Sequence, residues 1–191
     1  MKFSAVILAG GRSSRMGRDK AWLPLDGQPL LARQIAVVRR LNPMELFVSG
    51  RADTDYRSLG CPRLTDAFAN AGPLAGIAAG LEAASVPLVL VLAVDMPDMT
   101  SAMLGHLLGR CGSGTGVVPR VSHRLEPLAA VYPKAAGPLA VELLRQQLRA
   151  VRAFAERCQQ AGLVALHDVA AADWPCFTNW NAPGDPPMAG R

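Results

Sequence analysis

The stretch VILAGGRSSRMGRDK, residues 6 to 20, indicates how the rest of the chain folds. It opens with apolar residues that do not alternate with polar ones, a pattern typical of a strand buried on both faces of a parallel sheet. Gly10 and Gly11 then permit a tight turn whose backbone N–H groups can face an anion. Four cations follow within nine residues and are opposed only by Asp19: Arg12, Arg15, Arg18 and Lys20. A bound triphosphate would neutralise them.

This loop lacks the two common glycine-rich phosphate motifs. The Walker pattern would place Lys directly after Gly17, where the chain has Arg18, and GxGxxG is also absent. The charge distribution still favours a small anionic ligand, because residues 1–40 hold eight basic and two acidic side chains while the remainder holds twelve and thirteen. A nucleic-acid surface would need basic side chains spread more widely. A solvated basic turn remains the alternative.

Further apolar runs predict strands that alternate with helices. We expect strands at 3–9, 45–49, 88–94, 116–119 and 128–132, and helices at 29–41, 74–84, 101–108 and 137–154. Thr100 is the expected N-cap of the third helix. The alternation predicts an α/β fold of Rossmann-like, doubly wound type, with a mostly parallel sheet and helices on both faces. At this length we expect a single domain over residues 1–182 and a flexible tail over 183–191.

Several classes of protein do not fit the sequence. No apolar run approaches the roughly 18 residues of a membrane span, and the N-terminal run is too short for a signal peptide, so we expect a cytoplasmic protein. The four cysteines lack CxxC spacing, which favours reduced, mostly buried thiols over a zinc site: Cys61, Cys111, Cys158 and Cys176. The three histidines have no GxSxG partner, and His106 among helical Leu residues is expected to be structural.

Ligands of such folds bind at the carboxyl edge of the sheet, where polar residues follow three predicted strands. After the first strand comes the basic loop, after the second Ser49-Gly50-Arg51, and after the third Asp95-Met96-Pro97-Asp98. Asp95 could bind Mg²⁺ together with substrate phosphates. It could instead cap the following helix, a role that Asp98 fits better.

Two further segments suit a ligand site. Gly72-Pro73-Leu74-Ala75-Gly76, preceded by Asp66, predicts a helix N-terminus that a phosphate or a flat ring can approach. An ordinary loop-to-helix junction is the alternative. Asn179-Trp180-Asn181 at strand spacing would place both amides on one face, where they could serve a metal. A turn that starts before Pro183 explains the same residues.

Together these motifs resemble the molybdenum cofactor guanylyltransferases, the molybdopterin-guanine dinucleotide biosynthesis protein A family, which belong to a larger nucleotide-diphospho-sugar transferase-like group. The most specific motif is LAGGRSSRMGRDK. The resemblance covers most of the chain, because the later motifs follow in the family's order: Asp66 with GPLAGI, Asp95-Met96-Pro97, Arg124 to Leu128 with Val131-Tyr132, and Asn179 to Pro183. The Gly10-Gly11 pair and GPLAGI favour the guanylyl branch over the cytidylyl branch, which typically has LAAG.

The resemblance implies transfer of GMP from GTP to the terminal phosphate of molybdopterin, with pyrophosphate as leaving group and Mg²⁺ as cofactor. The matching catalytic positions are Arg15, Lys20 and Asp95, and Asp95 matches the metal ligand. The matching nucleotide-binding positions are Leu8, Ala9, Gly10, Gly11, Lys20, Asp66, Gly72, Pro73, Leu74, Asp95, Asn179 and Asn181. The chain departs from the family at the end of the second strand, where Val48-Ser49-Gly50 stands in place of a frequent Asn.

The implied partners are GTP and molybdopterin in its molybdenum-bound form. Transient contacts with other cofactor-biosynthesis proteins and molybdoenzymes are also expected, with no nucleic acid or membrane partner and a monomeric state. The alternatives are a CTP-dependent molybdopterin cytidylyltransferase, another nucleotidyltransferase with a small phosphorylated acceptor, and a non-catalytic nucleotide-binding module. Lys20 and Asp95 disfavour the last of these. Arg124, Arg149 and Arg152 are candidates to face the acceptor phosphate.

Overall fold

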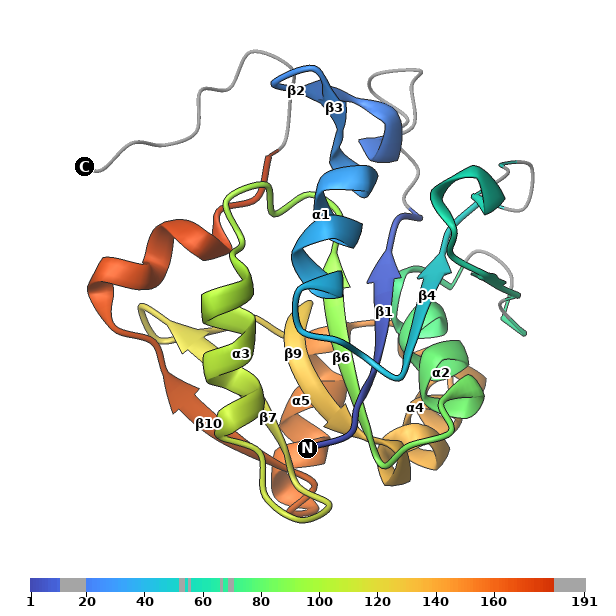
Figure 1. The fold of residues 1–191 in the computed structure, drawn as a ribbon. Helices are drawn as coiled ribbons and strands as arrows, with labels where there is room; N and C mark the ends of the chain where they lie inside the picture. Colours follow the sequence, from blue (N-terminus) through green and yellow to red (C-terminus); the bar gives the residue numbers. More distant parts are fainter. Residues whose placement is uncertain (11–19, 52–53, 55, 66, 69–70, 181–191) are drawn as a thin grey trace.

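The computed structural model describes residues 1–191 except 11–19, 52–53, 55, 66, 69–70 and 181–191 (Figure 1). The strands are β1 Ser4–Leu8, β2 Pro24–Leu25, β3 Gln28–Pro29, β4 Glu45–Ser49, β5 Arg63–Leu64, β6 Leu88–Ala93, β7 Gly116–Val121, β8 Arg124–Leu125, β9 Ala129–Pro133 and β10 Val164–Asp168. The α-helices are α1 Leu30–Arg39, α2 Pro73–Ala83, α3 Ser101–Gly109, α4 Gly137–Arg145 and α5 Val151–Gln160. The 3₁₀ helices are η1 Lys20–Trp22, η2 Arg57–Leu59, η3 Lys134–Ala136 and η4 Ala171–Phe177.

The main sheet has the strand order β10-β7-β9-β6-β1-β4-β5, with β8 paired to β7. The central strand β1 runs parallel to β4 on one side and to β6 on the other. β10 runs parallel to β7, and β9 alone on this path is antiparallel, to both β6 and β7. The prediction of a mostly parallel, Rossmann-like sheet is therefore confirmed.

Helices cover both faces of this sheet (Figure 1). Ala5 and Ile7 of β1 belong to one apolar cluster with the buried residues of α1 and α3. Val6 and Leu8 belong to a second cluster with α2, α4 and α5. The apolar runs of β1 and β6 lack alternation because side chains on both faces of these strands are buried.

The predicted single helix over 137–154 is wrong, because the chain forms α4 and α5 with a break at residues 146–150. Gln147 has a φ of 62°, in the left-handed region that ends a helix. The amide of Gln147 donates to the carbonyl of Leu144 at 3.0 Å, and that of Leu148 donates to Leu143 at 2.9 Å. Gly usually occupies this capping position. With Gln at this position, the sequence gives no signal that the helix ends.

The sequence analysis missed β10 and η4, which form the C-terminal arm over residues 164–180. β10 is an edge strand, and only Val164 among its five residues is buried. A strand with so little buried surface has no strong apolar pattern.

The four cysteines are free thiols, and Cys61 and Cys158 are buried as expected. Burial raises the pKa of Cys158 to about 12 and that of Cys111 to about 11, so both are protonated at neutral pH. Among the helices of the described residues, none has the length and apolar character needed to cross a bilayer.

Two glycines let α2 lie directly on the central strands. A Cβ atom on Gly76 would lie 2.8 Å from Leu8 Cδ2 and would also overlap Ser49 Oγ. A Cβ atom on Gly80 would lie 3.0 Å from Val6 Cγ1. The close approach fixes the N-terminal part of α2 next to the ends of β1 and β4.

We expect Gly76→Ala to lower the free energy of unfolding by about 1–3 kcal/mol, because the added methyl must displace Ser49 and Leu8. The matched control is Gly109→Ala, at the last residue of α3, where a Cβ meets no atom within 4 Å. That change should be neutral or stabilising, since Ala favours helix. Denaturant unfolding measures both. A Gly76→Ala protein as stable as the wild type would contradict the close packing.

Candidate functional site

The three central strands end side by side at the carboxyl edge of the sheet. Leu8 lies opposite Ser49 of β4 and Ala93 of β6. The amide of Ala9 donates to the carbonyl of Ser49 at 2.7 Å, and that of Val94 donates to the carbonyl of Leu8 at 3.1 Å. The loops that follow β1, β4 and β6 therefore begin together, as the fold predicted.

Three segments distant in sequence meet at this edge around Lys20. Its Nζ lies 3.3 Å from Asp95 Oδ2 and 3.2 Å from the backbone carbonyl oxygen of Trp180, to which it donates. The amide of Trp180 in turn donates to the backbone carbonyl of Asp95 at 2.8 Å. The sequence predicted that Lys20 and Asp95 share a site. It missed the backbone of Trp180 as the group that joins them.

The Lys20–Asp95 pair is only partly shielded from water. Their side chains are 27% and 26% exposed. Partly exposed ion pairs contribute about 1 kcal/mol or less to stability, so this contact adds little to the fold. It leaves a cation and a carboxylate accessible at the strand ends, where each can exchange its partner for a ligand.

Helix α1 holds the loop that carries Asp95. Gln34 Nε2 donates to the carbonyl of Met96 at 2.5 Å, and Arg33 Nε donates to the carbonyl of Pro97 at 2.9 Å. Gln34 is fully buried, and its Oε1 has no hydrogen-bond partner among the described residues. The sequence analysis missed both residues. The signal that could have revealed Gln34 was a polar residue within the apolar stripe of the predicted helix.

The alternative that Asp95 or Asp98 caps α3 is wrong. Thr100 is the N-cap, as predicted, and its Oγ1 accepts a hydrogen bond from the amide of Met103 at 3.1 Å. The carboxylate of Asp95 contacts Lys20 instead. A cap role therefore does not explain Asp95.

The end of β4, where the sequence departs from the frequent Asn, leaves no room for a side chain at Gly50. A Cβ atom on Gly50 would lie 2.6 Å from Tyr56 Cζ, so the buried Tyr56 ring occupies the space of a side chain. Tyr56 Oη accepts a hydrogen bond from the amide of Arg51 at 3.0 Å. Trp22 stacks parallel to this ring, with the ring centroids 6.2 Å apart. The rings of Tyr56 and Trp22 thus lie next to the carboxyl end of β4.

The N-terminus of α2 faces the same edge. Gly72 is the N-cap with a φ of 76°, and Pro73 begins the helix, as predicted. Gly76, in the first turns, lies against Leu8 and Ser49, the last residues of β1 and β4. A helix N-terminus favours anions through its free N–H groups and its dipole.

The residues predicted to face the acceptor phosphate lie in two places. The segment Arg124 to Leu128 lies next to the end of β6, because the amide of Ala93 donates to the carbonyl of Leu128 at 2.8 Å. Burial raises the pKa of Glu126 within this segment, and Arg124 opposes that shift.

Arg149 and Arg152 lie at the α4–α5 connection, where Arg152 Nε donates to Glu156 Oε1 at 2.9 Å.

Several predicted site residues lie outside the described residues: Gly11, Arg12, Arg15, Arg18, Asp66 and Asn181. Their roles stay predictions. Asn179 is exposed next to Trp180, and neither residue belongs to a strand, so the strand spacing assumed for the Asn pair does not hold at these two positions.

Comparison with known proteins finds a family and close relatives. Residues 5–177 match the family described as MobA-like NTP transferase domain. The chain is 38% identical over 188 residues to a probable molybdenum cofactor guanylyltransferase of Opitutus terrae, covering 95% of this chain and 92% of that protein. It is 34% identical over 186 residues to the molybdenum cofactor guanylyltransferase of Pseudomonas putida strain GB-1, covering 94% and 93%.

Solved structures share the fold. Molybdopterin-guanine dinucleotide biosynthesis protein A from Archaeoglobus fulgidus superposes with a TM-score of 0.72 at 23% identity, covering 95% of this chain and 94% of that one. The 2-C-methyl-D-erythritol 4-phosphate cytidylyltransferase from Thermus thermophilus gives 0.73 at 24% identity, covering 97% and 95%. These neighbours support the predicted nucleotide-diphospho-sugar transferase-like architecture.

We expect Gln34→Glu to destabilise the protein by at least about 2 kcal/mol at pH 7.5, because a buried carboxylate cannot donate to the Met96 carbonyl. The buried carboxyl will have a folded-state pKa above its unfolded value of about 4.3. The loss is therefore full above the folded pKa and shrinks as the pH falls through it.

Denaturant unfolding at pH 7.5 and pH 5 tests this effect. Gln159→Glu, at an exposed position of α5, is the matched control and should change stability little at either pH. Equal stability losses for the two variants would mean that the Met96 contact does not hold the loop.

Proposed function

This chain belongs to the family of MobA-like NTP transferase domains, and from that membership we propose that it transfers GMP from GTP to the terminal phosphate of molybdopterin. Pyrophosphate leaves, and the product is the guanine dinucleotide form of the cofactor. The names of the relatives that match along most of the chain support the substrates. The observation that carries the proposal is the Lys20–Asp95 pair at the shared ends of β1 and β6.

The reaction is an in-line displacement at phosphorus. A terminal phosphate oxygen of molybdopterin attacks the α-phosphorus of GTP, and the bond from that phosphorus to the oxygen bridging to the β-phosphorus breaks. A phosphate monoester has a second pKa of about 6, so the nucleophile is already ionised at neutral pH. The chain therefore needs no general base and acts by positioning the substrates and neutralising charge.

Lys20 is the residue proposed to bind the triphosphate and then the departing pyrophosphate. Its side chain is partly exposed, and its Nζ contacts only oxygen atoms in its two described hydrogen bonds, which phosphate oxygens can replace. Arg15 is proposed to assist it, on the strength of the family motif. The N-terminus of α2, from Gly72 to Leu74, and the turn from Leu8 to Gly11 are proposed to contact the nucleotide, together with Asp66.

The residues at the edge also suit a divalent cation. Asp95 offers a partly exposed carboxylate at a strand end, and the exposed amide of Asn179 is two residues before Asn181. Mg²⁺ prefers such oxygen ligands and commonly uses one or two carboxylates together with substrate phosphates. We propose that Asp95 holds Mg²⁺, with Asn179 or Asn181 nearby. When bound, the ion supplies positive charge against the phosphate oxygens.

The decisive experiment is a product assay by mass spectrometry. With molybdopterin, GTP and Mg²⁺, the wild type should form the guanine dinucleotide and pyrophosphate, whereas CTP in place of GTP should give little product. Asp95→Asn keeps the shape of the side chain but removes its charge, so it should retain the fold and lose almost all turnover. Efficient turnover with CTP would refute the guanylyl assignment, and wild-type rates for Asp95→Asn would refute the metal role.

We expect Lys20→Ala to weaken GTP binding by about 1.5–3 kcal/mol, which is a roughly 10- to 100-fold rise in the dissociation constant. The reason is the loss of one charge-assisted contact to the triphosphate. Calorimetric titration of GTP measures it. Lys2→Ala is the matched control, because Lys2 is exposed and precedes β1 at the opposite edge of the sheet. If both variants bind GTP equally well, Lys20 has no phosphate role.

A further inference from the structure

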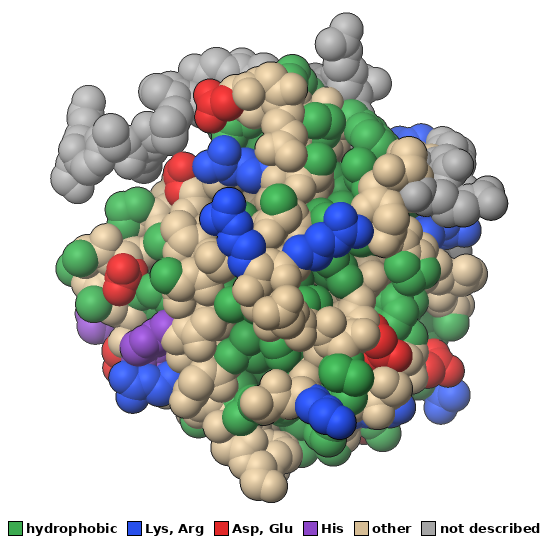
Figure 2. All heavy atoms as spheres, viewed as in Figure 1, with side chains coloured by type: hydrophobic (Ala, Val, Ile, Leu, Met, Phe, Trp, Pro, Cys, Tyr) green, Lys and Arg blue, Asp and Glu red, His purple; other side chains and the backbone are tan. Residues whose placement is uncertain are grey.

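A pair of histidines lies outside the proposed active site, between α3 and β10. His106 Nε2 and His167 Nε2 are 3.1 Å apart, and their ring centroids are 5.0 Å apart. The two residues are 61 positions apart in sequence. His106 is exposed, and His167 is partly exposed. The space-filling view shows histidine side chains at the surface next to basic ones (Figure 2).

The separation of the two nitrogens suits joint coordination of one metal ion. Zn²⁺ lies about 2.0–2.1 Å from a histidine nitrogen. Two such ligands are therefore about 2.9 Å apart at a right angle and about 3.3–3.4 Å apart at the tetrahedral angle. The observed 3.1 Å lies between these values. The two nitrogens are within hydrogen-bonding distance of each other, and a metal ion that replaces this hydrogen bond could bind both of them with little movement of α3 or β10.

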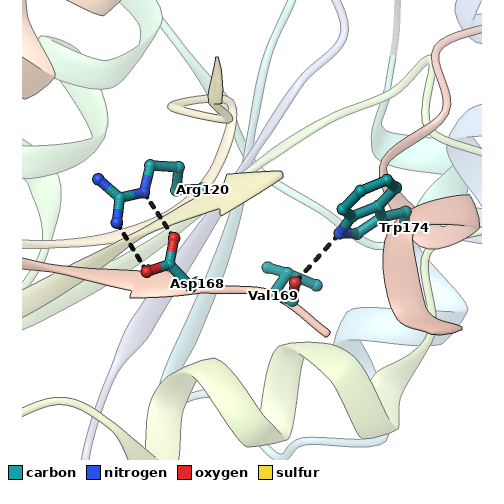
Figure 3. A network of polar contacts seen from close by, with 4 residues as sticks. All are labelled: Arg120, Asp168, Val169 and Trp174. Carbon is teal, nitrogen blue, oxygen red and sulfur yellow. Dashed lines mark hydrogen bonds and ion pairs between the residues drawn. The ribbon is translucent and has the colours of Figure 1, made fainter. Parts of the chain in front are cut away.

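The surroundings keep the pair available for a metal. Both side chains reach the surface, and the neutral imidazole is the form that binds a metal. The adjacent Asp168 is already engaged, because both of its carboxylate oxygens accept hydrogen bonds from Arg120, at 2.5 and 2.6 Å (Figure 3). In the structure Asp168 therefore pairs with Arg120 and does not form a three-residue ligand group with the two histidines.

Two imidazole nitrogens select the class of metal. Imidazole suits Zn²⁺, Ni²⁺ and Cu²⁺, whereas Mg²⁺ takes oxygen ligands. Within the described residues, no group of three or more His, Cys, Asp and Glu side chains could hold a metal. Within the described part of the chain, the candidate site therefore offers two histidine ligands.

We propose that His106 and His167 bind one divalent transition-metal ion through their Nε2 atoms, at a site separate from Asp95. The ion joins α3 to β10, the strand that begins the C-terminal arm, and this arm ends at Trp180. Because the two ligands come from distant parts of the chain, only the folded protein presents them together. Binding must therefore stabilise the fold.

Thermal unfolding with NiCl₂ at pH 7.5 tests the site. At a Ni²⁺ concentration about a hundred times the dissociation constant, the midpoint should rise by about 5–10 °C, and EDTA should reverse the rise. Either His106→Ala or His167→Ala should weaken Ni²⁺ binding at least tenfold. MgCl₂ should not replace NiCl₂ in this effect.

Two control variants locate the metal. His123→Asn removes the third histidine, which lies in a turn with a φ of 67° that Asn tolerates, and should leave Ni²⁺ binding unchanged. Asp95→Asn should also leave it unchanged, which separates this site from the proposed Mg²⁺ site. Imidazole proton signals of His106 and His167 should broaden more strongly with paramagnetic Ni²⁺ than those of His123. Absence of Ni²⁺ binding by the wild type, or wild-type Ni²⁺ affinity in either Ala variant, would overturn the proposal.

Discussion

The burial of β1 on both faces determines where this protein can carry out chemistry. All five residues of the strand are buried, and the polar side chain of Ser4 is satisfied by Glu45 at the start of β4. Functional polar groups therefore have to lie beyond the strand. Because β4 and β6 run parallel to β1, the loops after all three strands begin at one edge. The direction of three parallel strands thus brings Lys20 and Asp95 together from positions 75 residues apart.

Hydrogen bonds to backbone groups hold this edge in place, and the Lys20–Asp95 ion pair contributes little. Gln34 and Arg33 bind carbonyls of the loop that carries Asp95, and the amide of Trp180 binds the carbonyl of Asp95 itself. These contacts fix the main chain and leave the carboxylate of Asp95 with an accessible, weakly stabilising partner. A phosphate or a cation can therefore take over that contact without unfolding its support.

Much of the fold could be predicted from sequence, because buried parallel strands produce apolar runs that few other elements share. The same reasoning singled out Asp95, since a charged residue just after such a run has a defined place, whereas Lys20 came from the basic loop and the family motif. It failed where the deciding feature was a backbone group or a contact between residues that are distant in sequence. The carbonyl of Trp180 has no sequence signature, and the end of α4 depends on Gln147 in a conformation that usually indicates Gly. The pair of His106 and His167 required β10, whose exposed residues gave no strand pattern.

The C-terminal arm links this edge to the rest of the fold. Val169 donates from its amide to the carbonyl of Arg120 at 3.0 Å, and Trp174 Nε1 donates to the carbonyl of Val169 at 3.0 Å (Figure 3). At its far end the arm uses both backbone groups of Trp180, one of them to bind Lys20. A nucleotide that draws Lys20 onto its phosphates removes a donor from the Trp180 carbonyl, which must then bind water or a cation. Under the proposed function, nucleotide binding and the position of the arm are therefore thermodynamically coupled. The free energy by which a bound nucleotide strengthens or weakens a contact that holds the arm equals the free energy by which that contact strengthens or weakens nucleotide binding.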